Sequence, residues 1–146
     1  MYKIKFTNMN NKQFTATSKY KLKFVITICI SFVWLVNGLF CKLLNFVPRH
    51  EMIVARILGH DYSSIITKAI GVSEILMFIW ILSNIKSRWC AILQIILVAI
   101  MNIIEFTLAP DLLLFGHTNI IFATIFILIV YFNEFILGNL KANKPN

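Results

Sequence analysis

The segment Met101–Asn119, MNIIEFTLAPDLLLFGHTN, decides the fold expected for this chain. It contains the end of one long apolar run and the start of the next, separated by a break at Pro110. Polar side chains gather on both sides of this break, and one of them, Glu105, is ionisable. An ionisable side chain is costly in hydrocarbon, so it marks a partner, a cavity or a binding site. The segment predicts two neighbouring membrane helices that share a polar end.

The composition indicates an integral membrane protein. Hydrophobic residues make up 59% of the chain and charged residues 14%, whereas a soluble domain carries about 25% charged residues. The net charge of +8 comes largely from lysines placed ahead of the first apolar run. This asymmetry favours contact with the lipid bilayer over binding of nucleic acid, because nucleic-acid binding needs a basic face on a folded module.

Four apolar runs are long enough to cross a bilayer as helices, since about 20 residues span its hydrocarbon core. They comprise residues 22–47, 65–82, 89–109 and 118–137. A shorter amphipathic segment begins at Pro48 and ends at Gly59, as expected for a helix lying along the membrane interface. The sequence therefore predicts an all-α fold, a four-helix transmembrane bundle with a short interfacial helix between spans one and two.

The distribution of lysine and arginine predicts the topology. Residues 1–21 contain lysines, no acidic residue and no sustained helical period, so we expect a mobile, basic cytoplasmic tail. Residues 22–140 form the membrane domain, and residues 141–146 form a second basic tail. The positive-inside rule then places both termini in the cytoplasm. We expect a multi-pass protein of a bacterial cytoplasmic membrane.

Polar side chains are expected to converge beneath the extracytoplasmic surface, where helix rise places Lys42 and Glu105 at the same depth and Asn37 and Glu74 nearer the bilayer centre. We expect Glu105 to pair with Lys42 or Arg56. Glu74 must either be protonated or pair with one of the same two cations. Lys42 snorkelling to the interface, and asparagines acting as interhelical glue, are the structural alternatives. The cytoplasmic half is expected to be largely apolar, which argues against a path for protons or solutes. The candidate ligand-binding or polar-core residues are Asn37, Lys42, Arg56, Glu74, Asn102, Glu105, His117 and Asn119.

The polar residues of the third span, together with Val98, form one stripe along the helix. They recur at helical spacing, so the stripe is expected to face the bundle rather than lipid. Its members are Gln94, Val98, Asn102 and Glu105.

Motifs for a metal or a nucleotide are missing from the sequence. Cys29, Cys41 and Cys90 form no CxxC pair, and the three histidines match no ligand spacing. No span carries a mid-membrane histidine that would bind haem. We therefore expect no metal site; the cofactor is unknown, with quinone as the candidate.

Three stretches are similar to the DoxX-like family of small four-helix membrane proteins. They are WLVNGLFCKLLNFVPRHEMIVARILG (residues 34–59), residues 71–74, and NIIEFTLAPDLLLFGHTN (residues 102–119). The resemblance covers most of residues 34–137. It implies a four-helix bundle and a link to redox chemistry at the membrane, because the wider DoxX/DoxD group is named for a subunit of a thiosulfate:quinone oxidoreductase. No catalytic residue carries over from it.

Two functions follow from these observations. In the first, the chain is a quinone-associated redox subunit that works with a membrane-bound or soluble redox partner. In the second, it is a non-enzymatic accessory or scaffold protein whose buried polar pairs are structural. The sequence leaves open which of them holds, whether the chain is an enzyme, and its oligomeric state.

Overall fold

The computed structural model describes residues 2–113 and 118–138, with side chains described from residue 17 onward. Within these ranges every regular element is a helix, which confirms the all-α class. The chain forms α1 (Tyr2–Leu35), π-helical η1 (Val36–Leu43), α2 (Arg49–Leu58), α3 (Ser63–Ser83), α4 (Ser87–Leu108), the 3₁₀ turn η2 (Pro110–Leu112), α5 (Asn119–Tyr131) and π-helical η4 (Phe132–Ile136).

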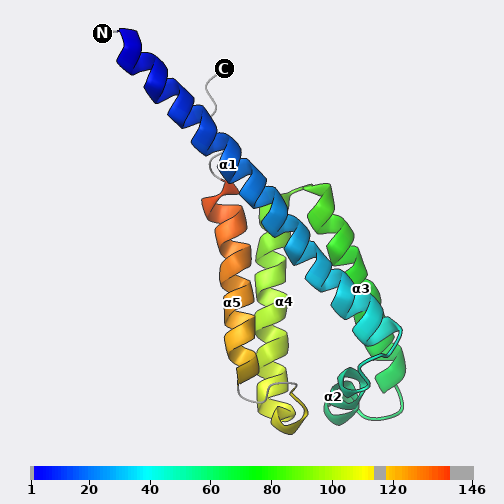
Figure 1. The fold of residues 1–146 in the computed structure, drawn as a ribbon. Helices are drawn as coiled ribbons and strands as arrows, with labels where there is room; N and C mark the ends of the chain where they lie inside the picture. The colour runs from blue at the N-terminus through cyan, green and yellow to red at the C-terminus, as the bar shows by residue number, and fades with distance from the viewer. Residues whose placement is uncertain (1, 114–117, 139–146) are drawn as a thin grey trace.

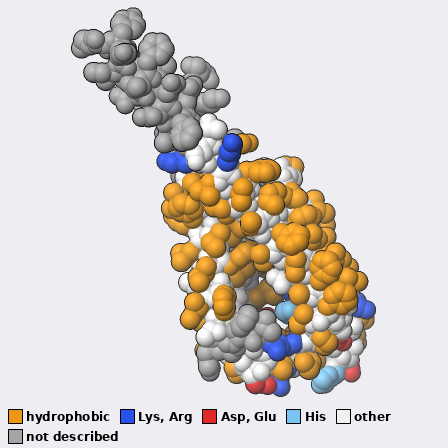
Figure 2. Space-filling view, in the orientation of Figure 1, with side chains coloured by type: hydrophobic (Ala, Val, Ile, Leu, Met, Phe, Trp, Pro, Cys, Tyr) orange, Lys and Arg blue, Asp and Glu red, His pale blue; other side chains and the backbone are white. Residues whose placement is uncertain are grey.

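Four of these helical segments are long and apolar enough to cross a membrane, as predicted. They are Thr17–Leu43, Ser63–Ser83, Ser87–Leu108 and Asn119–Ile136. Their outward-facing side chains are mostly hydrophobic, and these cover the middle of the molecule in Figure 2. A broad apolar surface of this kind suits contact with lipid rather than water.

The short helix α2 forms where the sequence predicts one. Pro48 immediately precedes its first residue, and Gly59 ends it with a φ of 94°, a conformation that favours glycine. Ile53 and Ala55 are buried, while Met52 and Arg56 are exposed. The predicted amphipathic helix between spans one and two is therefore present.

The N-terminal segment differs from the expectation. We predicted no helix in residues 1–21, but α1 begins at Tyr2 and runs without interruption into the first span (Figure 1). Extending an existing helix avoids the cost of nucleation, so a polar segment joined to a stable apolar helix can continue it. The mobility expected of this tail stays a prediction.

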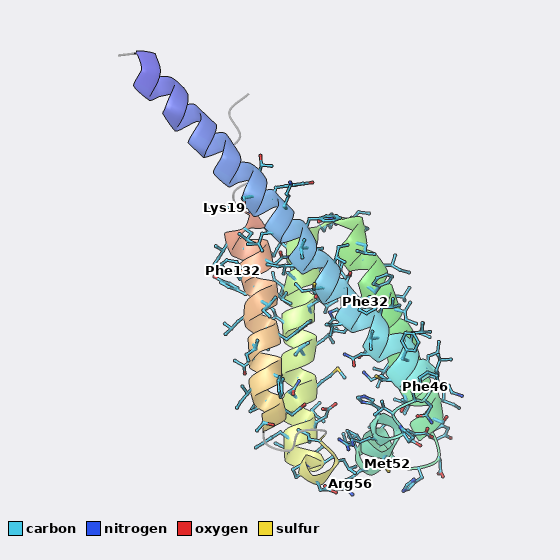
Figure 3. All side chains as sticks on the ribbon, viewed as in Figure 1. Lys19, Phe32, Phe46, Met52, Arg56 and Phe132 are labelled. Carbon is cyan, nitrogen blue, oxygen red and sulfur yellow. The ribbon has the colours of Figure 1, made fainter. Side chains whose placement is uncertain are left out.

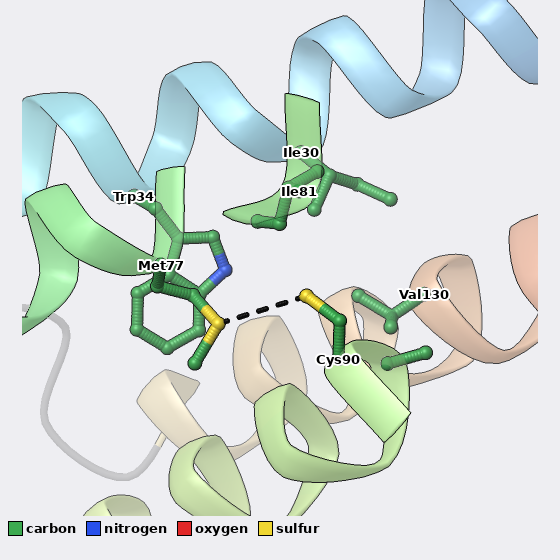
Figure 4. Close-up of a cluster of buried hydrophobic side chains, with 7 residues drawn as sticks. Ile30, Trp34, Met77, Ile81, Cys90 and Val130 are labelled. Carbon is green, nitrogen blue, oxygen red and sulfur yellow. Dashed lines mark hydrogen bonds between the residues drawn. The ribbon is translucent and has the colours of Figure 1, made fainter. Parts of the chain in front are cut away.

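The spans form two pairs. α1 and η1 pack along α3, and α4 packs along α5. The pairs meet in a buried core that draws on all four spans (Figure 4): Ile30, Trp34, Met77, Ile81, Cys90, Ala91 and Val130. We call the end of the bundle with the α3–α4 turn and η4 the tail end, and the opposite end, with α2 and η2, the α2 end. Toward the α2 end, α3 and α4 diverge (Figure 1).

Candidate functional site

A buried ion pair lies in the α2 half of the bundle. Lys42 Nζ donates a hydrogen bond to Glu74 Oε1. Lys42 is 5% exposed and Glu74 6% exposed, although both lie within apolar spans. Of the two cations expected near Glu74, the structure therefore selects Lys42, and Lys42 does not snorkel to the surface.

Two glycines hold the helices that carry this pair close together. A Cβ atom on Gly38 would lie 2.6 Å from the carbonyl oxygen of Gly71, and one on Gly71 would lie 2.8 Å from the carbonyl oxygen of Gly38. The backbones of η1 and α3 therefore touch at this crossing. Each glycine faces the charged residue of the other helix, because a Cβ on Gly38 would lie 2.9 Å from Glu74 Cβ and one on Gly71 would lie 3.1 Å from Lys42 Cβ. The close crossing therefore lets the Lys42 and Glu74 side chains meet.

A second carboxyl group faces the ion pair from α4. Glu105 is half-buried, and the charges of Lys42 and Glu74 both act on it. The predicted pairing of Glu105 with Lys42 or Arg56 is wrong. Lys42 bonds to Glu74, and Arg56 bonds to Asp111 of η2 at the exposed α2 end (Figure 3). Depth along a helix axis places Lys42 and Glu105 at one level, but only the lateral packing decides which acid Lys42 reaches.

The predicted asparagines bridge the other pair of helices. Asn119 Nδ2 donates to Asn102 Oδ1 at 3.0 Å, and Asn102 Nδ2 donates to the carbonyl of Val98 in its own helix. Asn102 and Asn119 therefore tie α4 to α5, as expected for interhelical glue. Asn37 is half-buried in η1. His117 lies outside the described residues.

Helix α2 supplies two groups that were not among the predicted site residues. Arg49 Nη1 is buried and has no hydrogen-bond partner among the described residues. Burial, helped by the positive charges of Lys42 and Arg49, lowers the pKa of His50 to about 4. His50 is therefore a neutral imidazole at pH 7. Their position directly after Pro48 is the signal that could have drawn attention to them.

A large cavity lies next to α2, at the α2 end. Its volume is about 630 Å³. It is lined by Pro48, Glu51, Met52, Ala55, Arg56, His60, Ser63 and Leu112. Its lining does not include Lys42, Glu74 or Glu105.

The tail end contains a second polar cluster, which the sequence analysis missed. Lys23 Nζ bonds to Glu134 Oε2 at 3.0 Å, and Ser87 Oγ donates to Glu134 Oε1 at 2.6 Å. Asn133 Nδ2 donates to Thr27 Oγ1 at 2.9 Å. The expectation of a largely apolar half at this end is therefore wrong.

The order of residues explains why this cluster was missed. Asn133 and Glu134 fall at the very end of the last apolar run, where a polar residue normally faces water. In the structure η4 turns both side chains inward, so that Asn133 and Glu134 are buried. The available signal was the adjacent pair Asn133 and Glu134 in the last turn of an apolar run, with Lys23 at matching depth in the first span.

Between the two polar regions, side chains of the core are also hydrogen-bonded. Trp34 Nε1 donates to Gln94 Oε1 at 3.0 Å, and Gln94 Nε2 lies 3.6 Å from Cys90 Sγ. Cys90 Sγ in turn lies 3.8 Å from Met77 Sδ (Figure 4). Gln94 is buried, and Val98, Asn102 and Glu105 are half-buried. The predicted protein-facing stripe on α4 is confirmed.

The three cysteines are free thiols. In residues 2–113 and 118–138 no group of three or more His, Cys, Asp or Glu side chains is placed to hold a metal ion.

Comparison with known proteins identifies the family. A family model described as the DoxX-like family matches residues 31–132. No curated protein and no solved structure matches the chain. Because the family match covers more than half of the chain and reaches from the first membrane helix to the last, this multi-pass integral membrane protein belongs to the DoxX-like family.

Proposed function

We propose that the α2 half of the bundle binds the head group of a quinone, and that the chain serves as a quinone-associated subunit of a membrane redox system. The observation that carries this proposal is the Lys42–Glu74 pair, buried in a membrane span beside a second carboxyl group, Glu105. A buried ion pair is weak evidence for stability, because desolvation of the two charges offsets much of their attraction. The burial of this pair beside a second carboxyl group is therefore better explained by a functional role than by a contribution to stability.

The groups around the pair have the hydrogen-bonding capacity that a quinone head group requires. Quinone carbonyls accept hydrogen bonds, and Lys42 Nζ and Arg49 Nη1 are donors. Glu74 Oε2 is buried without a hydrogen-bond partner among the described residues, as is Arg49 Nη1. A buried polar atom left unpaired costs about 1–3 kcal/mol. A quinone carbonyl could accept a hydrogen bond from a donor such as Arg49 Nη1, and the hydroxyl formed on reduction could donate one to an acceptor such as Glu74 Oε2.

The packing of the bundle supports access from the membrane. The two helix pairs join in the core near the tail end and diverge toward the α2 end. Figure 2 shows a hollow between apolar side chains in this part of the surface. An isoprenoid tail is apolar and would lie along such a lipid-facing surface while the head group reaches the polar residues.

The carboxyl groups near the ion pair would supply the protons for reduction of the quinone. Reduction of a quinone to a quinol takes up two electrons and two protons. A redox partner, membrane-bound or soluble, supplies the electrons. Glu105 would deliver protons to a bound head group, because its carboxyl lies close enough to the ion pair for the charges of Lys42 and Glu74 to act on it. Proton transfer by a positioned carboxyl is a common form of acid–base catalysis.

The test is a search for the bound ligand. The protein is extracted in mild detergent, its bound lipids are analysed by mass spectrometry, and ubiquinone and menaquinone analogues are added in thermal unfolding assays. We expect a co-purifying quinone and a higher melting temperature with one of the analogues. Glu105→Gln should weaken binding about tenfold, as loss of a charged hydrogen-bond partner implies. Glu51→Gln is the control, because Glu51 bonds to Asn45 at an exposed site. Absence of both bound quinone and thermal shift would contradict the proposal.

The second candidate is an accessory protein whose polar pairs only hold the bundle together. It is favoured by ion pairs between described residues that each join two different helical elements, such as Lys23–Glu134, Lys42–Glu74 and Arg56–Asp111. In that case Lys42→Met and Glu105→Gln would reduce folding or assembly, and no quinone would alter the melting temperature of any variant. A ligand-dependent shift that Glu105→Gln abolishes would instead select the quinone site.

A further inference from the structure

We propose that the polar cluster at the tail end is an internal water site, which keeps the partly buried Lys23–Glu134 pair hydrated within the membrane span. The proposal is independent of the quinone site, because none of its residues belongs to that site. It rests on a cavity, on an unpaired polar atom that lines the cavity, and on the set of hydrogen-bonding groups around it.

The cavity has the size of a water site. Its volume is about 30 Å³, and a cavity needs roughly 10–15 Å³ of this kind of volume to hold one water molecule. It is too small for an organic ligand, since such sites occupy about 300–1,000 Å³. Asn84 and Ser87, at the α3–α4 turn, contribute to its wall. Asn84 is exposed, so water can reach the cavity from this end of the bundle.

One polar atom of the wall has no partner. Asn133 is 6% exposed, and its Oδ1 is buried without a hydrogen bond among the described residues. The Nδ2 of the same amide already donates to Thr27 Oγ1, so Oδ1 is the atom left to be satisfied. Buried polar groups in folded proteins are nearly always hydrogen-bonded, to protein or to ordered water.

The other lining groups complete the coordination of a water molecule. An internal water makes about three hydrogen bonds. Gln94 Nε2 has a second hydrogen beyond the one directed at Cys90 Sγ, and the Glu134 carboxylate can accept more than its two present bonds. A water in the cavity would donate to Asn133 Oδ1 and Glu134 and accept from Gln94. The Lys23–Glu134 pair can then stay charged within the membrane spans, because Glu134 keeps part of its hydration.

Cys90 provides a native probe for this water. It lines the cavity and is 2% exposed, so its S–H group meets solvent only if the cavity is wet. In the Cys29→Ser/Cys41→Ser protein, the infrared S–H stretching band belongs to Cys90 alone. Transfer into D₂O should convert this band to S–D rapidly if water occupies the cavity.

Two variants remove the water by different means. Ala91→Val adds two methyl groups to the wall, and Asn133→Leu replaces the unpaired amide with an apolar group of similar size. In each, exchange of Cys90 should be at least about tenfold slower, because it then requires opening of the bundle. Ala99→Val is the matched control, on the same helix but away from the cavity, and should exchange like the parent protein.

The result that overturns the proposal is equally definite. If Cys90 exchanges slowly in the parent protein and in both variants, the cavity is dry. If it exchanges rapidly in the parent protein and in both variants, solvent reaches Cys90 by another route. If neither variant folds, a water-to-Gln94 side-chain cross-relaxation signal is sought in the parent protein by NMR. Its presence supports the site, and its absence overturns it.

Discussion

The two ion pairs of the α2 half contribute differently to stability because they differ in burial. Lys42 and Glu74 are almost completely enclosed, whereas the side chains of Arg56 and Asp111 are 46% and 59% exposed. Solvent screens an exposed pair, so it contributes about 0–1 kcal/mol. Removing one member of a buried pair leaves a charge without compensation, which costs about 3–5 kcal/mol. Loss of the buried ion pair should therefore lower the free energy of unfolding far more than loss of the exposed one.

Substitution of one member of each pair tests this difference. We expect Lys42→Met to lower the free energy of unfolding by about 3–5 kcal/mol, because Glu74 stays buried and unpaired. Arg56→Met should cost about 1 kcal/mol or less. Denaturant titrations of the detergent-solubilised protein measure both. The double variant Lys42→Met/Glu74→Leu should recover most of the loss, and a loss equal to that of the single variant would contradict this account.

The low pKa of His50 predicts a pH dependence of stability. Its pKa is about 4 in the folded protein against an ordinary 6.5. Between these values the unfolded chain binds a proton that the folded chain does not, so stability rises with pH across this window and is lost as pH falls. Burial is the largest cause of this low pKa, and the positive charges of Lys42 and Arg49 lower it further.

Melting temperatures of wild type and His50→Asn between about pH 7 and pH 4 test this dependence. The fall on acidification should be smaller in His50→Asn, because asparagine does not titrate. His60→Asn is the control, since His60 is exposed, and it should follow the wild type. Identical falls in wild type and His50→Asn would show that His50 does not contribute.

At the scale of the helices, both polar clusters fall on π-helical turns. Lys42 lies in η1, and Asn133 and Glu134 lie in η4. π-Helical turns are rare and occur often at functional sites. The wider turn changes which side of the helix the following residues occupy. In η4 this turns Glu134 toward Ser87 and Lys23, and in η1 it accompanies the close crossing of Gly38 and Gly71.

Gly38→Ala tests the crossing. By helix propensity alone, alanine would be more favourable than glycine by about 1 kcal/mol. At this site a Cβ would lie 2.6 Å from the Gly71 carbonyl oxygen and 2.9 Å from Glu74 Cβ, so η1 and α3 must separate. We expect a net loss of about 1–3 kcal/mol, as for other overpacked positions.

Gly138→Ala serves as the comparison for this measurement. There the nearest atom is Lys23 Nζ at 3.1 Å, at the end of a flexible side chain. We expect little change in its unfolding free energy. If Gly38→Ala were as stable as the wild type, the close approach of η1 and α3 would not be needed for the fold.

For the whole molecule, an even number of spans fixes the relation between the two ends of the chain. The four apolar helices alternate in direction, so α1 enters the membrane at the same end at which η4 completes the last span (Figure 1). Lys19, Lys21 and Lys23 lie at this end. The positive-inside rule predicts that this end faces the cytoplasm.

Fusion reporters test the topology. A reporter that is active only in the cytoplasm should be active at the N-terminus and after Asn146, and a reporter that is active only outside it should work when inserted at His60, in the exposed turn after α2. A reversed pattern would contradict the orientation. Activity at only one terminus would contradict the even number of spans.

The sequence by itself determined the class, the number of spans, the short helix after Pro48 and the protein-facing stripe on α4. Each of these follows from local patterns, namely run length, periodicity and helix-capping residues, that any fold of this chain must respect. It also identified Lys42, Glu74 and Glu105 as costly in hydrocarbon, because that cost depends on residue type and depth alone.

Only the tertiary structure decided which charges meet. Glu74 rather than Glu105 binds Lys42, because glycines in two different helices let their backbones touch. Glu134 turns inward, because a π-helical turn rotates it away from the membrane surface. Pairing depends on lateral contact and helix rotation, and these are set by packing between segments far apart in the chain. No pattern within a single segment records them.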